Sequence, residues 1–251
     1  MNGNMKSIII IPARMRSTRF PGKPLKKING VPMIKIIYDN IKSNRFITDI
    51  LVATCDKQIC DFCALNNMKF IRTSATHKRA SDRTAEAVLK YEKKYKKKID
   101  IVVMVQGDEP MVDNHMIAVS IKTFIKNKNI QVVNLISKIR DKNVFYDKNC
   151  IKVVKNKDNE AIYFSRSPIP NNINKKLFFG YKQVCIIPFR RNFLFKYLAM
   201  KETNLEKIES VDMLRILENG YNVKLVEIKK NTYPVDTLKD LRKVSKILNS
   251  R

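Results

Sequence analysis

A cluster of cations follows a strongly apolar run near the start of the chain. Residues 8–11 are four consecutive isoleucines, and the segment after them holds Arg14, Arg16, Arg19 and Lys23. Arginine grips phosphate oxygens through two parallel hydrogen bonds, and lysine adds a point charge. Gly22 gives the turn the freedom to bring backbone N–H groups close to a ligand. The segment predicts a phosphate-binding loop, although it lacks the Walker sequence. The alternative is a solvated basic loop.

Two aspartates supply an acidic counterpart. Asp108 follows the apolar run 101–105, and Asp236 follows a short apolar stretch near the other end of the chain. Two carboxylates about 4 Å apart repel by roughly 4 kcal/mol at an effective dielectric near 20. A divalent cation would remove this cost, and oxygen ligands combined with phosphates favour Mg²⁺. We therefore predict a magnesium site at Asp108 and Asp236. The alternatives are a turn residue at Asp108 and, at Asp236, the cap of a helix over 237–248.

The first half of the chain alternates short apolar runs with amphipathic segments. We expect strands at 7–11, 50–54, 69–72 and 101–105. Helices are expected at 33–41, after Asp56 as a possible cap, and from Ser81 or Asp82 to about Tyr95. Strands that are apolar on both faces and alternate with helices are typical of a parallel α/β sheet. Ligands of such sheets bind beyond the carboxyl ends of the strands. The basic loop and the acidic turn should therefore meet at one edge.

The second half is less regular. Strands are expected at 131–139, 151–154, 161–164, 184–187 and 223–228, and helices at 193–199, 205–218 and 238–248. Long crossover helices do not separate all of these strands, which favours a mixed sheet with an antiparallel excursion. We expect one domain over 1–251, with the excursion at about 140–190 as a possible dimer arm.

Composition narrows the class of protein. The chain has 251 residues, 44% of them hydrophobic, and a formal net charge of +27. The lysines are scattered along the chain, so a basic nucleic-acid-binding protein is the alternative and not the first choice. A field this positive would draw in a polyanionic substrate. No apolar run approaches the length of a membrane helix, and we expect a cytoplasmic protein with no membrane partner.

The cysteines are odd in number and irregularly spaced. The chain has five of them, and Cys60 and Cys63 form a C-x-x-C without a second ligand pair. A redox or zinc site would need such a partner. We expect both to be buried thiols on a helix.

Five segments of the chain, taken in order, form a specific pattern. They are Ile11-Pro-Ala-Arg-Met-Arg-Ser-Thr-Arg-Phe-Pro-Gly-Lys-Pro-Leu25, Val105-Gln-Gly-Asp-Glu-Pro-Met111, Ala161-Ile-Tyr-Phe-Ser-Arg-Ser-Pro-Ile-Pro170, Leu205-Glu-Lys-Ile-Glu209 and Val235-Asp-Thr237. In these segments the chain resembles the CMP-Kdo synthetases, or 3-deoxy-manno-octulosonate cytidylyltransferases, nearly from end to end.

The resemblance implies a Rossmann-like nucleotidyltransferase, usually a homodimer, that uses CTP and Mg²⁺. The anomeric hydroxyl of a 3-deoxy-ulosonic acid such as Kdo would attack the α-phosphate and release pyrophosphate. The nucleotide-binding residues implied are Pro12, Ala13, Arg14, Ser17, Arg19, Lys23, Asp82 and Arg83. Those near the sugar are Gln106, Arg166 and Glu209, and the metal ligands are Asp108 and Asp236. The catalytic set is then Arg14, Lys23, Asp108 and Asp236. No general base is implied.

Two departures from the family's pattern concern the base and the sugar. The family's His-x-Ser-Gly-Thr-Asp-Arg carries Arg79 and Ala80 here in place of Ser and Gly. Its His-x-Gly-x-Tyr aligns with Lys182-Gln-Val-Cys-Ile186, where the His and the Tyr are missing. The alternatives are therefore a different Kdo-like sugar acid and a homologue that binds nucleotide without turnover.

Overall fold

The computed structural model describes residues 5–17, 19–171, 173 and 179–250. It divides into two compact units. The first contains the described residues up to Ile121 and those from Thr232 onward, and the second runs from Lys122 to Asn231. The predicted single domain with an excursion at 140–190 stays a prediction, and residues 172 and 174–178 of that range lie outside the described residues.

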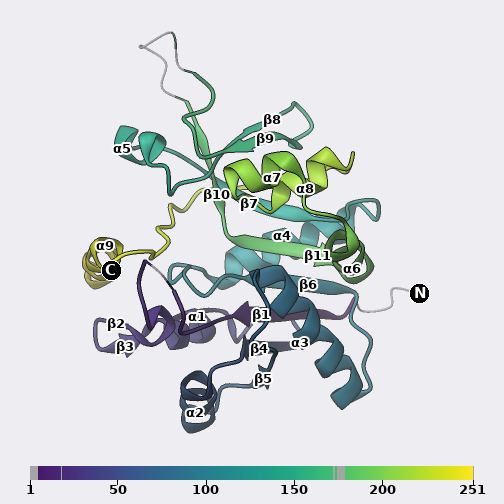
Figure 1. Ribbon diagram of the computed structural model, residues 1–251, viewed down its shortest axis with the longest axis vertical. Coiled ribbons are helices and arrows are strands. Elements are labelled where there is room, and N and C mark those ends of the chain that lie inside the picture. The colour runs from purple at the N-terminus through teal and green to yellow at the C-terminus, as the bar shows by residue number, and fades with distance from the viewer. Residues whose placement is uncertain (1–4, 18, 172, 174–178, 251) are drawn as a thin grey trace. The chain divides into compact units, whose positions relative to one another are not determined.

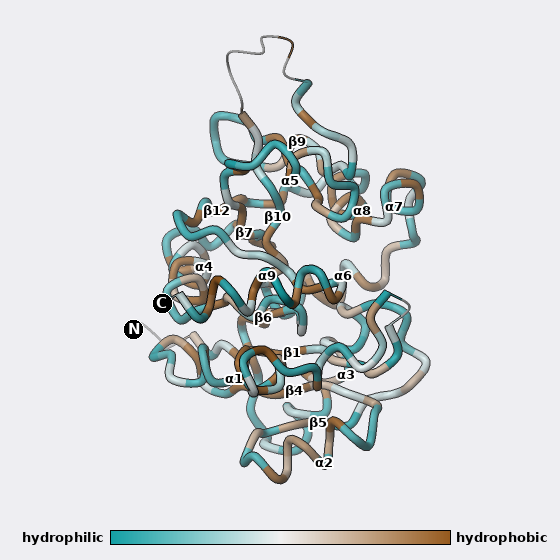
Figure 2. The backbone as a smooth tube through the Cα atoms, turned by 90° about the vertical axis from the view of Figure 1, so that its left-hand side faces the viewer, coloured by the Kyte–Doolittle hydropathy of each residue, from teal (hydrophilic) through white to brown (hydrophobic). Residues whose placement is uncertain are grey.

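The first unit is built on a parallel sheet (Figure 1). Its strands are β1 (Ser7–Pro12), β4 (Asp49–Thr54), β5 (Phe70–Arg72) and β6 (Ile101–Val105), in the order β6-β1-β4-β5. All three pairings are parallel. The four isoleucines of β1 are completely buried, and the strand lies in a mostly hydrophobic stretch of the tube in Figure 2. The predicted parallel sheet is confirmed, and the carboxyl ends of β1 and β6 lie side by side.

Helices and short turns surround this sheet. The helices are η1 (Lys23–Leu25), α1 (Met33–Ile41), α2 (Lys57–Leu65), α3 (Ala80–Tyr95), α4 (Asn114–Lys126) and α9 (Leu238–Asn249). The short strands β2 (Lys27–Ile28) and β3 (Val31–Pro32) pair with each other in antiparallel fashion. α3 packs across the strands of the sheet, and α2 packs against β4 and β5. α4 begins in the first unit and ends in the second. The sequence did not predict α4.

The second unit is a mixed sheet. The strands of this sheet are β7 (Val133–Lys138), β8 (Lys152–Lys155), β9 (Ala161–Ser165), β10 (Tyr181–Val184) and β12 (Lys224–Ile228). The residues of β11 (Ile186–Arg190) also fall in the second unit, but this strand is not part of the mixed sheet. β12 pairs with β7 in parallel, whereas β7, β10, β8 and β9 pair in antiparallel fashion. The predicted antiparallel pairing within a mixed sheet is confirmed, but the single strand expected at 184–187 is two strands that meet at Cys185.

Four helices belong wholly to the described part of the second unit. They are α5 (Lys142–Tyr146), α6 (Arg191–Ala199), α7 (Asn204–Glu209) and α8 (Met213–Glu218). The single helix expected over 205–218 is wrong, because Ser210 ends α7 in a left-handed conformation with φ of 51°. An L-residue rarely adopts this conformation within a helix. The break places Glu209 at the end of a helix.

The thiols behave as predicted. Cys60 and Cys63 lie buried on α2. Burial raises the pKa of the Cys63 thiol to about 12, so neither redox nor metal chemistry is favoured there. Within the described residues, no helix has both the length and the apolar character needed to cross a membrane.

Candidate active site

The phosphate loop predicted after β1 is fixed by backbone contacts. Met15 N donates to Asp56 Oδ2 at 2.8 Å, and Gly22 N donates to Met15 O at 2.9 Å. Gly22 has φ of 71°, a left-handed conformation that favours glycine. Asp56 stands at the start of α2, but its carboxylate makes no capping bond and holds the loop instead. The predicted capping role is therefore wrong for its side chain.

The acidic turn after β6 comes close to the same loop. At Gly107 a Cβ atom would lie 3.0 Å from Pro12 O, so a larger residue would push the two segments apart. Val235 N donates to Asp108 O at 2.9 Å and ties the C-terminal segment to the turn. Segments that are far apart in the sequence thus bring Asp108 and Asp236 into one place.

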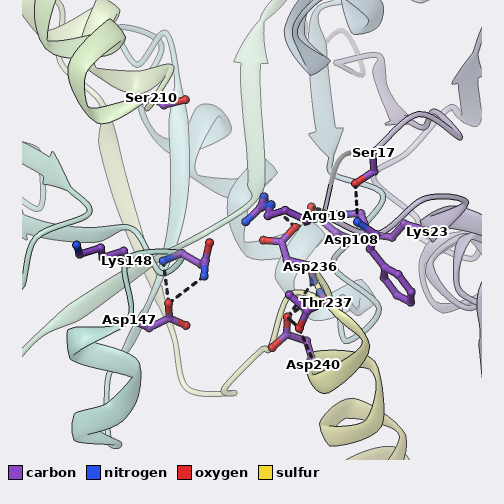
Figure 3. Close-up of polar contacts among 12 residues, drawn as sticks. Ser17, Arg19, Lys23, Asp108, Asp147, Lys148, Ser210, Asp236, Thr237 and Asp240 are labelled. Carbon is purple, nitrogen blue, oxygen red and sulfur yellow. Dashed lines mark hydrogen bonds and ion pairs between the residues drawn. The ribbon is translucent and has the colours of Figure 1, made fainter.

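Lys23 lies between the two carboxylates (Figure 3). Its Nζ donates to Asp108 Oδ2 at 3.0 Å and to Asp236 Oδ1 at 3.1 Å. Arg19 Nη2 lies 3.2 Å from the same oxygen of Asp236. Burial lowers the pKa of Lys23, but the two carboxylates outweigh burial and raise it above its usual value. The ammonium therefore stays charged and offsets the repulsion between the acids.

Asp108 has the feature expected of a cation ligand. Its Oδ1 is buried and, within the described part of the chain, has no hydrogen-bond partner. A buried carboxylate oxygen without a partner is costly. No group of three or more His, Cys, Asp or Glu gathers around a possible metal in the described ranges. Two carboxylates fit Mg²⁺, which takes few protein ligands and completes its shell with substrate phosphates and water.

The helix-cap alternative for Asp236 is wrong. The residue that caps α9 is Thr237, whose side chain accepts a hydrogen bond from Asp240 N. Asp240 accepts in turn from Thr237 N at 2.9 Å, which completes a capping box (Figure 3). The carboxylate of Asp236 is left to face Lys23 and Arg19.

These groups line a cleft of about 360 Å³ in the first unit. Of the predicted residues, the cleft is lined by Pro12, Ala13, Arg14, Ser17, Arg19, Lys23, Arg83, Gln106, Asp108 and Asp236. The cleft is also lined by seven residues outside the predicted nucleotide-, sugar- and metal-binding sets: Arg16, Pro24, His77, Lys78, Arg79, Ala80 and Gly107. Of these, Arg16 is a cation of the predicted phosphate loop, and Arg79 and Ala80 are departures from the family's pattern. Seven of the lining residues are Lys or Arg and two are Asp, an excess of positive charge that suits a polyanion.

Asp82 and Arg83 have different places. Asp82 lies in the first turn of α3, where its carboxylate accepts from Arg79 N at 3.2 Å, and it is not among the residues that line the cleft. Arg83 is buried and does line it. Its Nη1 donates to Ser74 O at 3.2 Å, so this arginine also holds the loop that precedes the helix.

Arg166 and Glu209 form a cluster of their own in the second unit. Glu209 accepts from Ser165 Oγ at 2.6 Å and from Arg166 N at 2.8 Å. The Arg166 guanidinium donates to three carbonyl oxygens, those of Glu209, Lys148 and Ser210. These contacts use three of its five N–H groups, so a ligand could be bound without breaking them.

The second departure from the family's pattern lies in strands of this unit. Lys182 on β10 and Ile186 on β11 are both buried. Between them, Gln183 donates to Asn134 Oδ1 at 2.5 Å. Asn134 is buried and donates to Val184 O at 3.0 Å. The segment is therefore part of a hydrogen-bonded core.

A family model described as cytidylyltransferase matches residues 8–230. The chain belongs to the cytidylyltransferase family. Two of its relatives are named 3-deoxy-manno-octulosonate cytidylyltransferase: that of Geobacter metallireducens is 36% identical and that of Francisella tularensis is 38% identical. The match covers 96% of this chain in both cases, and 96% and 98% of the relatives.

A solved structure agrees with the sequence relatives. CMP:2-keto-3-deoxy-manno-octonic acid synthetase, solved in complex with CTP, has a TM-score of 0.88 and 32% identity. The match covers 98% of this chain and 99% of that one. The predicted resemblance, the nucleotidyltransferase fold and the assignment as an enzyme of this family are confirmed. A basic nucleic-acid-binding protein is correspondingly disfavoured.

Proposed function

We propose that this cytidylyltransferase transfers CMP from CTP to the anomeric hydroxyl of Kdo and releases pyrophosphate. The observation that carries the proposal is the cluster of Lys23, Asp108 and Asp236 within a cleft rich in cations. Its relatives act, by name, on 3-deoxy-manno-octulosonate, and the similar solved structure holds CTP. The product is an activated sugar acid of the kind used to build surface polysaccharide.

The cations of the cleft would bind the triphosphate. Arg14, Arg19 and Lys23 line it on the side of β1 and η1, and Ser17 lies in the same loop. Guanidinium groups grip phosphate oxygens in pairs, while the ammonium acts as a point charge. Arg19 is half exposed, with 51% of its side chain accessible, so it is placed to meet an arriving nucleotide.

Asp108 and Asp236 would hold Mg²⁺. Asp108 Oδ1 is buried and has no partner in the described residues. A cation bound to this oxygen would remove the free-energy cost of burying it without a partner. When bound, Mg²⁺ supplies charge neutralisation on the phosphate oxygens and a template for their geometry. Lys23 would then exchange one or both carboxylates for phosphate oxygens, since its flexible stem allows a short movement.

The transfer would be an in-line displacement. The anomeric oxygen forms a bond to the α-phosphorus, and the bond between that phosphorus and the bridging oxygen breaks. The electron pair leaves with the pyrophosphate, and the hydroxyl proton is lost to solvent or buffer. Arg14 and Lys23 would stabilise the charge that develops on the leaving group. Positioning and charge neutralisation therefore supply most of the catalysis.

For the sugar acid, we propose a role for Gln106 in the first unit and, separately, for the Arg166–Glu209 cluster in the second unit, in each case on the family resemblance. Gln106 lines the cleft at the end of β6. Arg166 keeps two N–H donors beyond its three carbonyl contacts, enough for one carboxylate oxygen pair. Glu209 would fix the turn that carries Arg166.

The test is pyrophosphate release, measured with each of the four nucleoside triphosphates against a panel of 3-deoxy-ulosonic acids. The proposal expects turnover that needs CTP, Kdo and Mg²⁺ together. Faster turnover with another acid of the panel would show that Kdo is not the preferred substrate, and it would link the departures at Arg79 and Ala80 to the changed sugar preference. CTP binding without turnover on any acid would contradict the proposal and favour a non-catalytic homologue.

The family resemblance also supports a homodimer in the cytoplasm. Light scattering at micromolar concentration tests the first point: a mass near 59 kDa is expected, twice the 29.3 kDa of the chain. A mass that stays at the single-chain value would contradict it.

A further inference from the structure

His77 begins the segment that matches the family's His-x-Ser-Gly-Thr-Asp-Arg, and it lines the cleft, but the sequence alone assigned no role to its side chain. It belongs to the loop between β5 and α3, which also contributes Lys78 and Arg79 to the lining. The loop therefore brings cations to the cleft from a part of the first unit other than the loop after β1. The contacts that fix the His77 side chain indicate whether it could bind a ligand in the cleft.

Two residues on one face of α3 clamp this loop. Arg83 and Glu86 are three positions apart, so they lie on adjacent turns of the same helix face. Arg83 Nη1 donates to Ser74 O at 3.2 Å, and Ser74 N donates to Glu86 Oε2 at 2.8 Å. Both polar backbone groups of Ser74 are thus bound by side chains of opposite charge from one helix. The path of the loop is fixed at its start.

Glu86 also binds His77. The same oxygen that accepts from Ser74 N contacts His77 Nε2, and the other oxygen lies 2.7 Å from Lys90 Nζ. Burial raises the pKa of Glu86, but its contacts with Lys90, Ser74 and His77 outweigh burial and lower the pKa to about 2. The carboxylate is therefore ionised at any working pH. It engages one nitrogen of the ring, which leaves Nδ1 as the ring atom for a ligand.

We propose that His77 is a further substrate-contacting residue and that Glu86 is the positioning residue that fixes its ring. With the nucleotide bound, the ring would be protonated on both nitrogens, so that Nε2 donates to Glu86 and Nδ1 donates to the phosphate chain. The inference rests on the proposed function, since it takes the cleft to be the triphosphate site. A phosphate is the fitting ligand because Lys78 and Arg79 lie beside His77 in the lining and the cleft carries a large excess of cations.

The first experiment uses substitutions at His77, with CTP affinity in the presence of Mg²⁺ as the readout. H77A should weaken CTP binding about tenfold, or about 1.4 kcal/mol. H77Q should weaken it equally, because its amide nitrogen can reach Glu86 in place of Nε2 but nothing replaces Nδ1. H115A is the matched control, since His115 is the other histidine of the chain and is exposed on α4. It should leave CTP binding unchanged.

H77Q also distinguishes a direct contact between His77 and the phosphates from a purely structural role of His77. A purely structural His77 would be rescued by H77Q, which keeps the bond to Glu86, and its CTP affinity would return to the wild-type value. That result would overturn the proposal. Cytidine measured as a competitor gives a second check. Its affinity should be the same in wild type and H77A, and an equal loss for cytidine and CTP would overturn the assignment to phosphate.

The second experiment tests the positioning role of Glu86. E86A should weaken CTP binding about tenfold in the wild type, but by no more than threefold in the H77A background, because the two residues act as a unit. K90M removes the other ionic partner of Glu86 and should change CTP affinity less than twofold. Fully additive losses in the double variant would overturn the positioning role.

Failure of the proposed function and failure of the inference at His77 would give different results. If wild type binds CTP but releases no pyrophosphate with any sugar acid, the proposed function fails while the binding tests at His77 still apply. If wild type turns over normally and H77A matches it in KM, kcat and CTP affinity, the inference at His77 fails and the proposed function stands.

Discussion

Two lysines of the molecule, Lys23 and Lys152, satisfy their charges in different ways. In the first unit, Lys23 is paired with the side chains of Asp108 and Asp236 in a cleft. In the second unit, the buried Lys152 donates to three backbone carbonyls, those of Asp147, Cys150 and Arg166. The first cation can exchange its partners for a ligand, since carboxylates and ammonium can separate to meet a metal and phosphates. The second cation cannot, because its partners are fixed backbone.

The different partners of the two lysines distinguish a ligand-binding site from a part of the fold that serves stability. Burial lowers the pKa of Lys152, while burial at Lys23 is outweighed by the two carboxylates that raise its pKa. Lys152, bound by backbone carbonyls, connects the segment 147–152 to Arg166 and stabilises the fold. A lysine bound by carboxylates marks a place where a divalent cation fits. Substitutions should therefore affect turnover around Lys23 and the free energy of unfolding at Lys152.

The largest effect is expected at Asp108. D108N keeps the size of the side chain but removes the charge that would hold Mg²⁺, so kcat should fall at least ~1,000-fold, or about 4 kcal/mol in the barrier. Initial rates of pyrophosphate release at saturating CTP measure this. D61N is the control, since Asp61 is an exposed partner of Lys57 on α2. A D108N rate within tenfold of wild type would place the metal elsewhere.

Lys23 should give the next largest effect. K23M removes the cation that serves the leaving pyrophosphate, and kcat/KM should fall about 100-fold, in the range of lost electrostatic stabilisers. The same variant should bind Mg²⁺ more tightly without nucleotide, because no ammonium competes for the two carboxylates. Calorimetric titration with Mg²⁺ measures the second effect. Weaker Mg²⁺ binding by K23M would show that Lys23 supports the metal site and does not compete with it.

In the second unit, K152M should act on stability. Three carbonyl oxygens lose their donor, and the free energy of unfolding should fall by about 2 kcal/mol. Urea denaturation gives the value, with K148M as the control because Lys148 is exposed in the same segment. If K152M were as stable as wild type, the three carbonyls would be satisfied in another way, and the proposed stabilising role of Lys152 would be wrong.

The smallest effect concerns acid stability at Glu86. The pKa of this carboxyl is about 2 in the folded chain against 4.5 ordinarily, so its contribution is present above pH 4.5 and is lost as the pH falls toward 2. E86Q should be about 1 kcal/mol less stable than wild type at pH 7. The two proteins should converge near pH 2, as measured by denaturant unfolding across pH. A gap that persists at pH 2 would mean that packing, and not charge, is responsible.

Much of the fold follows from local pattern. The helix at 33–41 and the strand at 101–105 match the structure residue for residue, because their apolar spacing is unbroken. The meeting of Asp108 with Lys23 followed from the rule that parallel strands end at one edge of the sheet. The sequence did not show that Thr237, and not Asp236, caps α9, because both residue types are common helix caps and the two are neighbours.

Long-range contacts account for what the sequence did not reveal. Asp56 was expected to cap a helix, but its carboxylate binds Met15 N, 41 positions earlier in the chain. The role of Glu86 depends on how the loop folds back to place Ser74 and His77 against α3. Local spacing gives no sign of either contact. The left-handed Ser210, which divides the helix expected at 205–218, likewise has no signal in the periodicity.

The most direct test of the metal-triphosphate cleft is Mn²⁺ binding in the presence of CTP, followed by electron paramagnetic resonance in wild type and D108N. We expect one bound Mn²⁺ per chain in the wild type, with an affinity that CTP increases, and an affinity weakened about 100-fold or more in D108N. Equal Mn²⁺ affinity in the two proteins, with CTP present, would contradict it.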